Sequence, residues 1–349
     1  MERRDIEKKI KLCRNPHINI YKGLPPQILI AKQTQGVVTM QLNFKESRLI
    51  SFTKYLYKSA KRSIAAYSSK FSRHDYTQPQ HLSLNGLKRR LRLNYREVVE
   101  IVDEMPRVKK ILGLKKIPHF TTIQKFFQRI STFLLERILN QTLKLFEICE
   151  PWVAIDGTGH SSSYASRYYA KKLKKQKKRR RKSYSKNSIA VDIKTQAILA
   201  HKVRKGPKHD SIDAIPIIRK TKRYKPRGYS LDKGYDAEHI HKVIREEIKA
   251  ESHIPLREGK VVRGKYRQLM LTEFDKDKYH QRSIVETVIS VEKRVFGDNN
   301  TSRCDRLRNK ESKLRNICYN VYRAVRIFMF EILRFSTEPK IIKLNYTIS

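Results

Sequence analysis

The chain has 349 residues, which is long enough for one large domain and a smaller one with a real hydrophobic core. Its 78 lysines and arginines outnumber 33 aspartates and glutamates, so the formal net charge is +45. A charge of this size predicts a polyanionic partner and favours nucleic acid over an anionic membrane. No apolar run is long enough to span a membrane and the N-terminus is charged, so we expect a cytoplasmic protein.

The N-terminal third of the chain reads as a poorly defined arm followed by helices. Residues 1–45 form the arm, with room for a short strand, because Gly23, Pro25 and Pro26 interrupt any regular pattern. Residues 46–148 follow as a mainly helical region. The first predicted helix has an apolar face formed by Phe52, Tyr55, Leu56 and Ser59.

Two capping boxes predict further helices in this region. Asn94 with Glu97 begins one helix, and Thr121 with Gln124 begins another that carries apolar residues as far as Ile138. Short helices with arginine and lysine between apolar faces are typical of a helix-turn-helix-like DNA-binding module. An ordinary helical packing domain with basic surfaces fits the same spacing equally well, and both interpretations stay open.

From residue 151 the pattern changes to mixed strands and helices. It predicts an α/β domain with a mixed sheet over residues 150–335, followed by a tail at 336–349. The predicted strands span 152–156, a hairpin over 188–200 that turns at Lys194 and Thr195, 228–232 and 252–256. The predicted helices span 213–219, 237–249, a segment from about residue 279 and a long last helix through 314–332. Cys318 shares the apolar face of the last helix, so we expect a buried thiol rather than a zinc ligand or a disulfide partner.

Four polar residues near the C-terminal end of this domain have an informative spacing. Tyr279 is followed at offsets of 3, 7 and 14 by Arg282, Glu286 and Lys293. On one unbroken α-helix these positions fall within a stripe roughly 60° wide. A carboxylate flanked by two cations and a phenol suits a metal ion and a phosphate backbone.

Two further acids are predicted at the carboxyl ends of strands, where open α/β sheets place their ligands. Asp156 ends one strand and precedes Gly157, a residue that lets a phosphate backbone approach closely. Asp232 ends another strand. With Glu286 they supply hard oxygen ligands for Mg²⁺ or Mn²⁺. The remaining acids are interpreted as surface or turn residues: Asp192, Asp213 and Asp236.

The pattern Tyr-x2-Arg-x3-Glu-x6-Lys, met from Tyr279 to Lys293, resembles the signature of prokaryotic insertion-sequence transposases with a DDE catalytic triad. Two more blocks resemble this family: Val-Ala-Ile-Asp-Gly-Thr-Gly at 153–159 and Asp-Lys-Gly-Tyr-Asp at 232–236. The segment Gly-Pro-Lys-His-Asp-Ser at 206–211 resembles the stretch between them. The resemblance covers residues from about 77 to 330.

This resemblance implies a ribonuclease-H-like fold, a mixed sheet flanked by helices and preceded by a mainly helical N-terminal domain. It implies a triad of Asp156, Asp232 and Glu286 that performs phosphoryl transfer on double-stranded DNA. Asp156 would bridge two divalent ions, Mg²⁺ or Mn²⁺, and the other two acids would each complete one. The helical region would bind terminal inverted repeats, and pairing two element ends implies a homodimer on DNA, nucleoid-associated when bound.

The other signature residues are predicted to bind DNA. Arg282 can fork onto a phosphate, Lys293 can add a second phosphate contact, and Tyr279 can stack on a base or hydrogen-bond a phosphate. The alternative for Arg282 and Lys293 is an ion pair with an acid on the helix surface.

A run of basic residues between the first two predicted strands is interpreted as a clamp on the DNA backbone. Each phosphate that it neutralises should steepen the salt dependence of binding by about 0.9 in a log–log plot. The run comprises Lys171, Lys172, Lys174, Lys175, Lys177, Lys178, Arg179, Arg180, Arg181 and Lys182.

Three alternatives to a transposase remain open from sequence. A decayed or domesticated copy would keep the basic surfaces and bind DNA without chemistry, but it would have no reason to retain all three acids. A ribonuclease-H-like nuclease would cut DNA without joining it. A ribosomal-type RNA-binding protein would fit the charge but would not need the acids.

Overall fold

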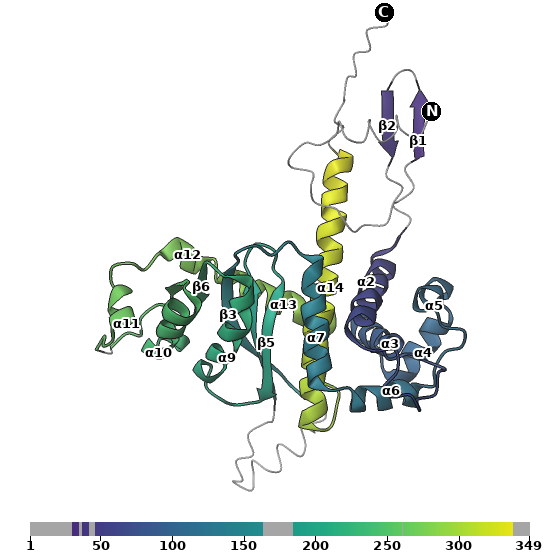
Figure 1. The fold of residues 1–349 in the computed structure, drawn as a ribbon, viewed down its shortest axis with the longest axis horizontal. Helices are drawn as coiled ribbons and strands as arrows, with labels where there is room; N and C mark the ends of the chain where they lie inside the picture. The colour runs from purple at the N-terminus through teal and green to yellow at the C-terminus, as the bar shows by residue number, and fades with distance from the viewer. Residues whose placement is uncertain (1–29, 35–36, 42–45, 163–183, 260, 338–349) are drawn as a thin grey trace, which may run out of the picture. The chain divides into compact units, whose positions relative to one another are not determined.

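A computed structural model of the protein (Figure 1) describes most of the chain, which divides into two compact units. One unit comprises residues 46–330. The other comprises residues 1–45 and 331–349, and within it the strands β1 (Ile30–Thr34) and β2 (Val37–Gln41) pair antiparallel. The described residues are 30–34, 37–41, 46–162, 184–259 and 261–337. Among them, no helix is long and apolar enough to cross a membrane.

Residues 46–145 are helical, as predicted, and local capping sets several helix starts. The Asn94–Glu97 capping box is confirmed, because Asn94 Oδ1 accepts from Glu97 N–H (3.0 Å) and Glu97 Oε2 accepts from Asn94 N–H (2.8 Å). A second box, Thr77 with Gln80, begins a helix that the sequence pattern did not predict. The helices are α2 (Arg48–Ser63), α3 (Gln78–Leu91), α4 (Tyr95–Asp103), α5 (Pro106–Leu112), α6 (Phe120–Arg129), α7 (Thr132–Thr142) and a 3₁₀ turn at Leu143–Leu145.

The predicted capping box at Thr121 and the single long helix after it are wrong. Helix α6 already begins at Phe120, so Thr121 lies inside it. Ile130 is extended, and Ser131 Oγ accepts from the Leu134 N–H (3.2 Å) to begin α7. A serine that caps a new helix competes with continuation of the old one.

The α/β part contains a five-stranded sheet in the order β5-β4-β3-β6-β7. Strands β3, β4 and β5 pair antiparallel, whereas β3, β6 and β7 pair parallel. This confirms the predicted mixed sheet flanked by helices and the ribonuclease-H-like fold class. The strands are β3 (Trp152–His160), β4 (Ser185–Asp192), β5 (Ile198–Lys205), β6 (Gly228–Leu231) and β7 (Glu251–His253).

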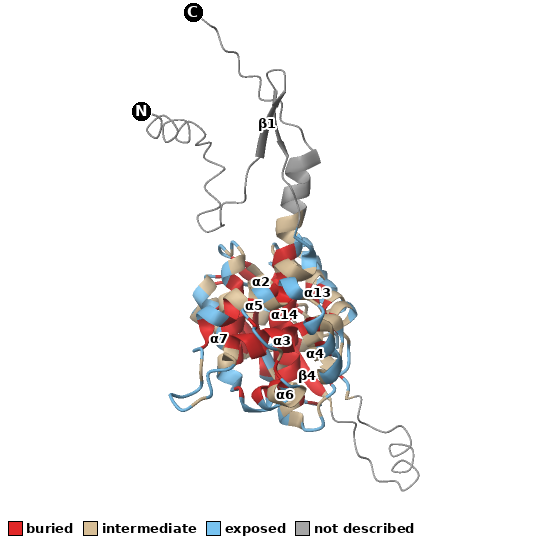
Figure 2. Ribbon diagram, turned by 90° about the vertical axis from the view of Figure 1, so that its right-hand side faces the viewer, coloured by how far each residue is buried: buried red, intermediate tan, exposed pale blue. Residues whose placement is uncertain are grey.

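Helices cover both faces of this sheet, and alternate side chains of each strand enter different cores. In β3, Ala154 belongs to a core shared with α2, α3, α13 and α14, whereas Val153 and Ile155 belong to a core with α9 and α10. Figure 2 shows buried residues concentrated in α3, α14 and β4. Cys318 of α14 is fully buried, as predicted, and burial raises the pKa of its thiol to about 12.

The remaining elements connect the strands and close the domain. The predicted helices at 213–219, 237–249 and 314–332 are confirmed as α9, α10 with its π-helical continuation, and α14. The bounds are α9 (Ser211–Thr221), a 3₁₀ turn at Lys222–Tyr224, another at Lys233–Tyr235, α10 (Glu238–Lys242), the π-helix Val243–Ile248, α11 (Lys265–Leu269), α12 (Lys276–His280), α13 (Ser283–Phe296) and α14 (Asp305–Thr337).

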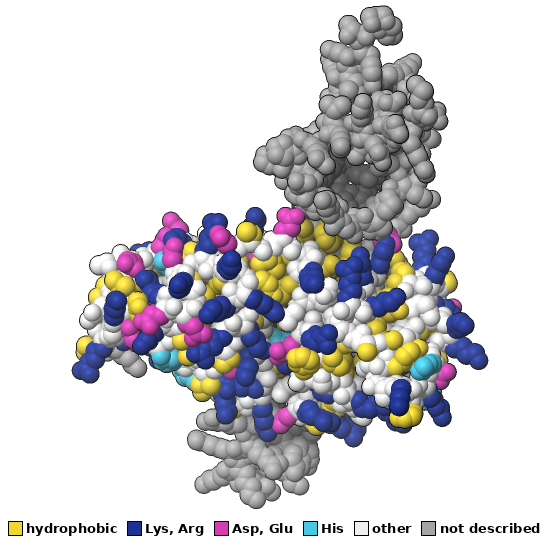
Figure 3. Space-filling model, viewed as in Figure 1, with side chains coloured by type: hydrophobic (Ala, Val, Ile, Leu, Met, Phe, Trp, Pro, Cys, Tyr) yellow, Lys and Arg dark blue, Asp and Glu magenta, His cyan; other side chains and the backbone are white. Residues whose placement is uncertain are grey.

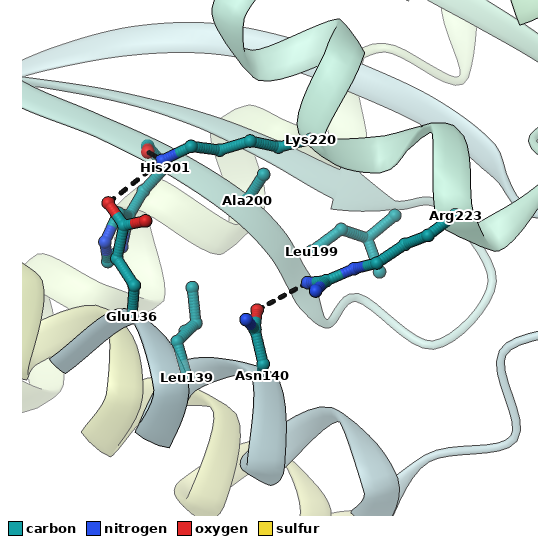
Figure 4. A pocket seen from close by; sticks show the side chains of 8 residues that line it. All are labelled: Glu136, Leu139, Asn140, Leu199, Ala200, His201, Lys220 and Arg223. Atoms are coloured by element: carbon teal, nitrogen blue, oxygen red, sulfur yellow. Dashed lines mark hydrogen bonds and ion pairs between the residues drawn. The ribbon is translucent and has the colours of Figure 1, made fainter. Parts of the chain in front are cut away.

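A pocket of about 210 Å³ lies where α7 faces β5 and the end of α9. In Figure 4, Lys220 and Glu136 point toward each other across it, and Arg223 points toward Asn140. Glu136 Oε1 also accepts from Lys313 of α14 (2.9 Å), so one carboxylate ties α7 to two other helices. Burial alone would raise the pKa of Glu136, but its contacts with the two lysines lower the pKa to about 2. We therefore interpret the pocket as part of the packing between α7, α9 and α14 rather than as a binding site.

The assumption of one unbroken helix from Tyr279 to Lys293 is wrong. Helix α12 ends at His280, and α13 begins at Ser283. Between them Arg282 N–H donates to Tyr279 O (2.9 Å), the tighter bond of a 3₁₀ turn. The break has a tertiary cause, because α12 is held at β6, where Ser230 Oγ donates to Lys278 O (2.9 Å), while α13 packs on β3 and β4.

Candidate active site

Asp156 and Asp232 lie side by side at the end of the parallel pair β3–β6. The last paired residues are Ile155 and Leu231, and the two aspartates follow them directly. The prediction that Asp156 ends its strand is wrong, because β3 continues to His160 through its pairing with β4. On the β6 side, however, Asp156 is the first residue beyond the pairing. Asp156 lies two residues after Ala154 in the same strand, so its side chain is on the same face of the sheet, the face that α13 covers.

Arg282 connects this strand end to Glu286. One guanidinium nitrogen of Arg282 lies 2.5 Å from Glu286 Oε1, and the other lies 3.5 Å from Asp156 Oδ2. The aromatic ring of Tyr279 lies 5.9 Å from the guanidinium carbon. Three of the four signature residues, Tyr279, Arg282 and Glu286, therefore lie together despite the helix break, and Arg282 also reaches Asp156.

The charges of Glu286 and Asp232 both act on the Asp156 carboxyl. Burial raises the pKa of Asp156, and the negative charges of Glu286 and Asp232 raise it further. The Gly157 N–H, which donates to Asp156 Oδ1 (2.7 Å), and the Arg282 guanidinium act in the opposite direction. Burial disfavours the charge of Arg282, yet Asp156 and Glu286 hold its pKa above the usual value.

The three carboxylates are the hard oxygen donors that Mg²⁺ and Mn²⁺ prefer. Within the described ranges, no three carboxylate, histidine or cysteine side chains converge as metal ligands do. Asp156 and Glu286 converge on the Arg282 guanidinium instead. The donor set therefore fits a divalent cation in its chemistry, and Arg282 provides the positive charge in the observed arrangement.

Lys293 is not part of this cluster. Its ammonium group pairs with Asp298 (3.3 Å), just beyond the C-terminal end of α13. The ion pair that the sequence left open as an alternative is therefore present at Lys293, whose predicted phosphate contact stays a prediction.

Asp236 was interpreted as a surface or turn residue; it does end the 3₁₀ turn Lys233–Tyr235, but it is not a surface residue. Its side chain is buried and accepts two hydrogen bonds from the Arg267 guanidinium, at 2.7 and 2.8 Å. The Arg257 N–H donates to the same carboxylate (3.0 Å), and the Arg257 guanidinium donates to the carbonyls of Lys233 and Gly234. This network, which we name the Asp236 clamp, holds the turn that follows Asp232. No local signal marks it, because Arg267 lies 31 residues further along the chain.

Asp213 is likewise buried rather than exposed. It pairs with Arg204 (3.0 Å), and nearby Lys186 pairs with Asp210 (2.5 Å). A Cβ at Gly157 would lie 3.0 Å from Asp210 Oδ1. Gly157 therefore makes room for Asp210, a role that the sequence did not predict. Asp192, in contrast, is the predicted turn residue, although it is buried; it accepts from the backbone N–H of Thr195 (3.0 Å).

Basic side chains outnumber acidic ones on the face shown in Figure 3. Figure 3 shows lysine and arginine spread over one whole face, with fewer acidic side chains among them. The predicted basic clamp at 171–182 lies outside the residues that the structure describes.

A mixed sheet in which two aspartates directly follow the last paired residues of the central parallel pair, beside a helix that carries a glutamate, is a ribonuclease-H-like arrangement. Residues 148–321 match the family model of the transposase DDE domain, and the chain belongs to this family. It is thus a transposase-type protein of a mobile element, with DNA as its partner, in a family that generally uses divalent metal ions. No curated protein is significantly similar to the chain.

Proposed function

We propose that the protein is an insertion-sequence transposase that binds the terminal inverted repeats of its element, cleaves the DNA there and joins the freed 3′-hydroxyl to target DNA. One observation carries the proposal. Within a transposase DDE domain, Asp156 and Asp232 directly follow the last paired residues of the parallel strands β3 and β6, and Glu286 shares Arg282 with Asp156.

Asp156, Asp232 and Glu286 would hold two Mg²⁺ or Mn²⁺ ions, with Asp156 shared between them. Bound there, the ions would activate the attacking water or 3′-hydroxyl and stabilise the leaving 3′-oxygen. The Gly157 N–H holds one oxygen of Asp156 in place, and the Asp236 clamp holds the turn after Asp232. These contacts restrict both aspartates before any ligand arrives.

The DNA would be held by cations around the acids. Arg282, with its two-pronged guanidinium, would bind a phosphate beside the scissile bond, with Tyr279 against a base or phosphate. Lys293 and the basic run at 171–182 would extend this contact along the backbone. We assign recognition of the inverted repeats to the helical region 46–148, and we propose that a homodimer pairs two element ends.

Cleavage of labelled oligonucleotides that carry the element's ends tests the proposal. With Mg²⁺ or Mn²⁺ the full-length chain should nick these ends, and Glu286→Gln should abolish nicking while DNA affinity changes little. Glu247→Gln is a matched control, because Glu247 pairs with Arg219 and takes no part in the site. Cleavage that survives in Glu286→Gln would remove Glu286 from the triad.

A strand-transfer assay separates the proposed function from its alternatives. A transposase should join the 3′ end to a target plasmid. Nicking without any joined product would favour the ribonuclease-H-like nuclease, and DNA binding without nicking would favour a decayed copy.

A further inference from the structure

Arg282 occupies an unusual position for a residue that is predicted to bind DNA. Its guanidinium lies between two candidate metal ligands, 2.5 Å from Glu286 Oε1 and 3.5 Å from Asp156 Oδ2. The Arg282 side chain is only 17% exposed, whereas that of Glu286 is 55% exposed. The arginine therefore faces the carboxylates rather than the solvent through which DNA would approach.

The backbone explains this orientation. The turn between α12 and α13 places Arg282 one residue before α13, and Glu286 follows one helical turn later. Asp156 meets the same guanidinium from β3, because its side chain lies on the sheet face that α13 covers. The fork geometry of arginine lets one cation contact both acids through different nitrogens.

A guanidinium on Glu286 Oε1 and Asp156 Oδ2 hinders a divalent cation from binding the same oxygens. They compete for the same lone pairs, and their positive charges repel each other strongly in a partly buried site. The acids that face Arg282 are those of the candidate triad, Asp156, Glu286 and Asp232. Metal binding and the Arg282 contacts should therefore be alternatives.

We propose that Arg282 is the internal counter-ion of the catalytic acids, which holds Asp156 and Glu286 together in the DNA-free protein and must leave them for a metal ion to bind. The proposal rests on the proposed function, because it takes these acids as the metal site. A DNA phosphate is the natural acceptor for the displaced guanidinium. Arg282 would thus suppress metal binding before DNA is engaged and favour it afterwards, since coupling of this kind is reciprocal.

Titration of the DNA-free, full-length chain with Mn²⁺, with free Mn²⁺ measured by electron paramagnetic resonance, tests the inference without any activity assay. Arg282→Gln should bind Mn²⁺ at least about fivefold more tightly than the wild type. Arg282→Lys keeps the positive charge but loses the forked guanidinium, so its Mn²⁺ affinity should lie between those of the wild type and Arg282→Gln. Arg219→Gln removes a cation that pairs with Glu247 outside the site, and it should leave Mn²⁺ affinity unchanged.

The outcomes separate this inference from the proposed function. If Glu286→Gln and Asp156→Asn weaken Mn²⁺ binding but Arg282→Gln does not strengthen it, the counter-ion role is wrong and the metal site stands. If neither acid variant alters Mn²⁺ binding, the metal site itself is wrong, and the counter-ion role falls with it. Circular dichroism and thermal unfolding establish that each variant is folded, and an equal gain in Arg219→Gln would also overturn the inference.

Discussion

Asp156 and Asp232 are neighbours, because each directly follows one residue of the last pair between the parallel strands β3 and β6, Ile155 with Leu231. The local sequence predicted each aspartate at the end of a strand, but it did not predict that the two strands are neighbours. The pairing of β3 with β6 decides it, because the parallel register of Ile155 with Leu231 brings the residues that follow them to the same place.

This adjacency predicts that the two aspartates act on the same metal ions. Asp156→Asn and Asp232→Asn should each weaken Mn²⁺ binding. The double variant should bind Mn²⁺ almost as tightly as the weaker-binding of the two single variants. The reason is that the losses of binding free energy from two ligands of one site do not add. The affinities come from the same Mn²⁺ titration. Losses that simply add would indicate two independent sites.

The Asp236 clamp should matter for both stability and catalysis. Asp236→Asn leaves the mostly buried Arg267 without its charged partner, and we expect it to lower the free energy of unfolding by about 3 kcal/mol. It should also slow nicking by about tenfold to a hundredfold, because the turn after Asp232 loosens. Urea unfolding and the nicking assay measure the two effects.

Arg257→Gln is the companion variant for this clamp. It keeps the Asp236–Arg267 pair but removes the guanidinium that binds the carbonyls of Lys233 and Gly234. Slower nicking with little loss of stability would support a positioning role. Wild-type nicking in both variants would reduce the clamp to a stabilising contact.

Four buried histidines make the stability depend on pH. Burial lowers the pKa of His201 to about 3 and those of His81, His160 and His241 to about 4. The unfolded chain takes up these protons below about pH 6.5 and the folded chain does not, so stability is present above that pH and falls as the pH drops. Each histidine contributes at most about 1.4 kcal/mol per pKa unit.

Glu292 acts in the opposite direction, because burial raises its pKa to about 7, so a single-histidine variant isolates the effect. His201→Asn keeps a partner for the side chain of Asn316, which lies 2.9 Å from His201 Nδ1. Between pH 7.5 and 5.0 this variant should lose less stability than the wild type, measured by urea unfolding at each pH. Parallel curves would show that His201 takes up a proton in the folded state.

The basic run at 171–182 should govern the salt dependence of DNA binding. Replacement of Lys174, Lys175, Lys177 and Lys178 by glutamine should reduce the log–log salt slope by about 0.9 for each phosphate that is no longer neutralised. Fluorescence anisotropy at several salt concentrations gives the slope. Four exposed lysines elsewhere provide a matched set with the same charge change: Lys222, Lys225, Lys242 and Lys249. An equal change of the salt slope in both sets would mean that the run adds to the net positive charge but does not form a specific clamp on the DNA.

Local patterns predicted those features of the fold that depend on neighbours in sequence. The Asn94–Glu97 box was correct because both partners lie within one helical turn. The hairpin at Lys194 and Thr195 and the last long helix were correct for the same reason, since alternation and helical periodicity are short-range signals. Tertiary contacts overrode such signals where a strand held part of a predicted helix. Ser230 of β6 binds the Lys278 carbonyl and so holds α12 apart from α13.

The sequence by itself determined the charge of the protein and the residue types of the candidate site: three acids, an arginine and a phenol. Only the tertiary structure decided which of them meet. Arg282 contacts Glu286 four residues away, an ion pair that the sequence left open as the alternative to a phosphate contact, but it contacts Asp156 across 126 residues. Asp236 was misread because its partner Arg267 is distant in sequence. Burial and ion pairing between distant segments depend on how strands and helices pack, which no local pattern encodes.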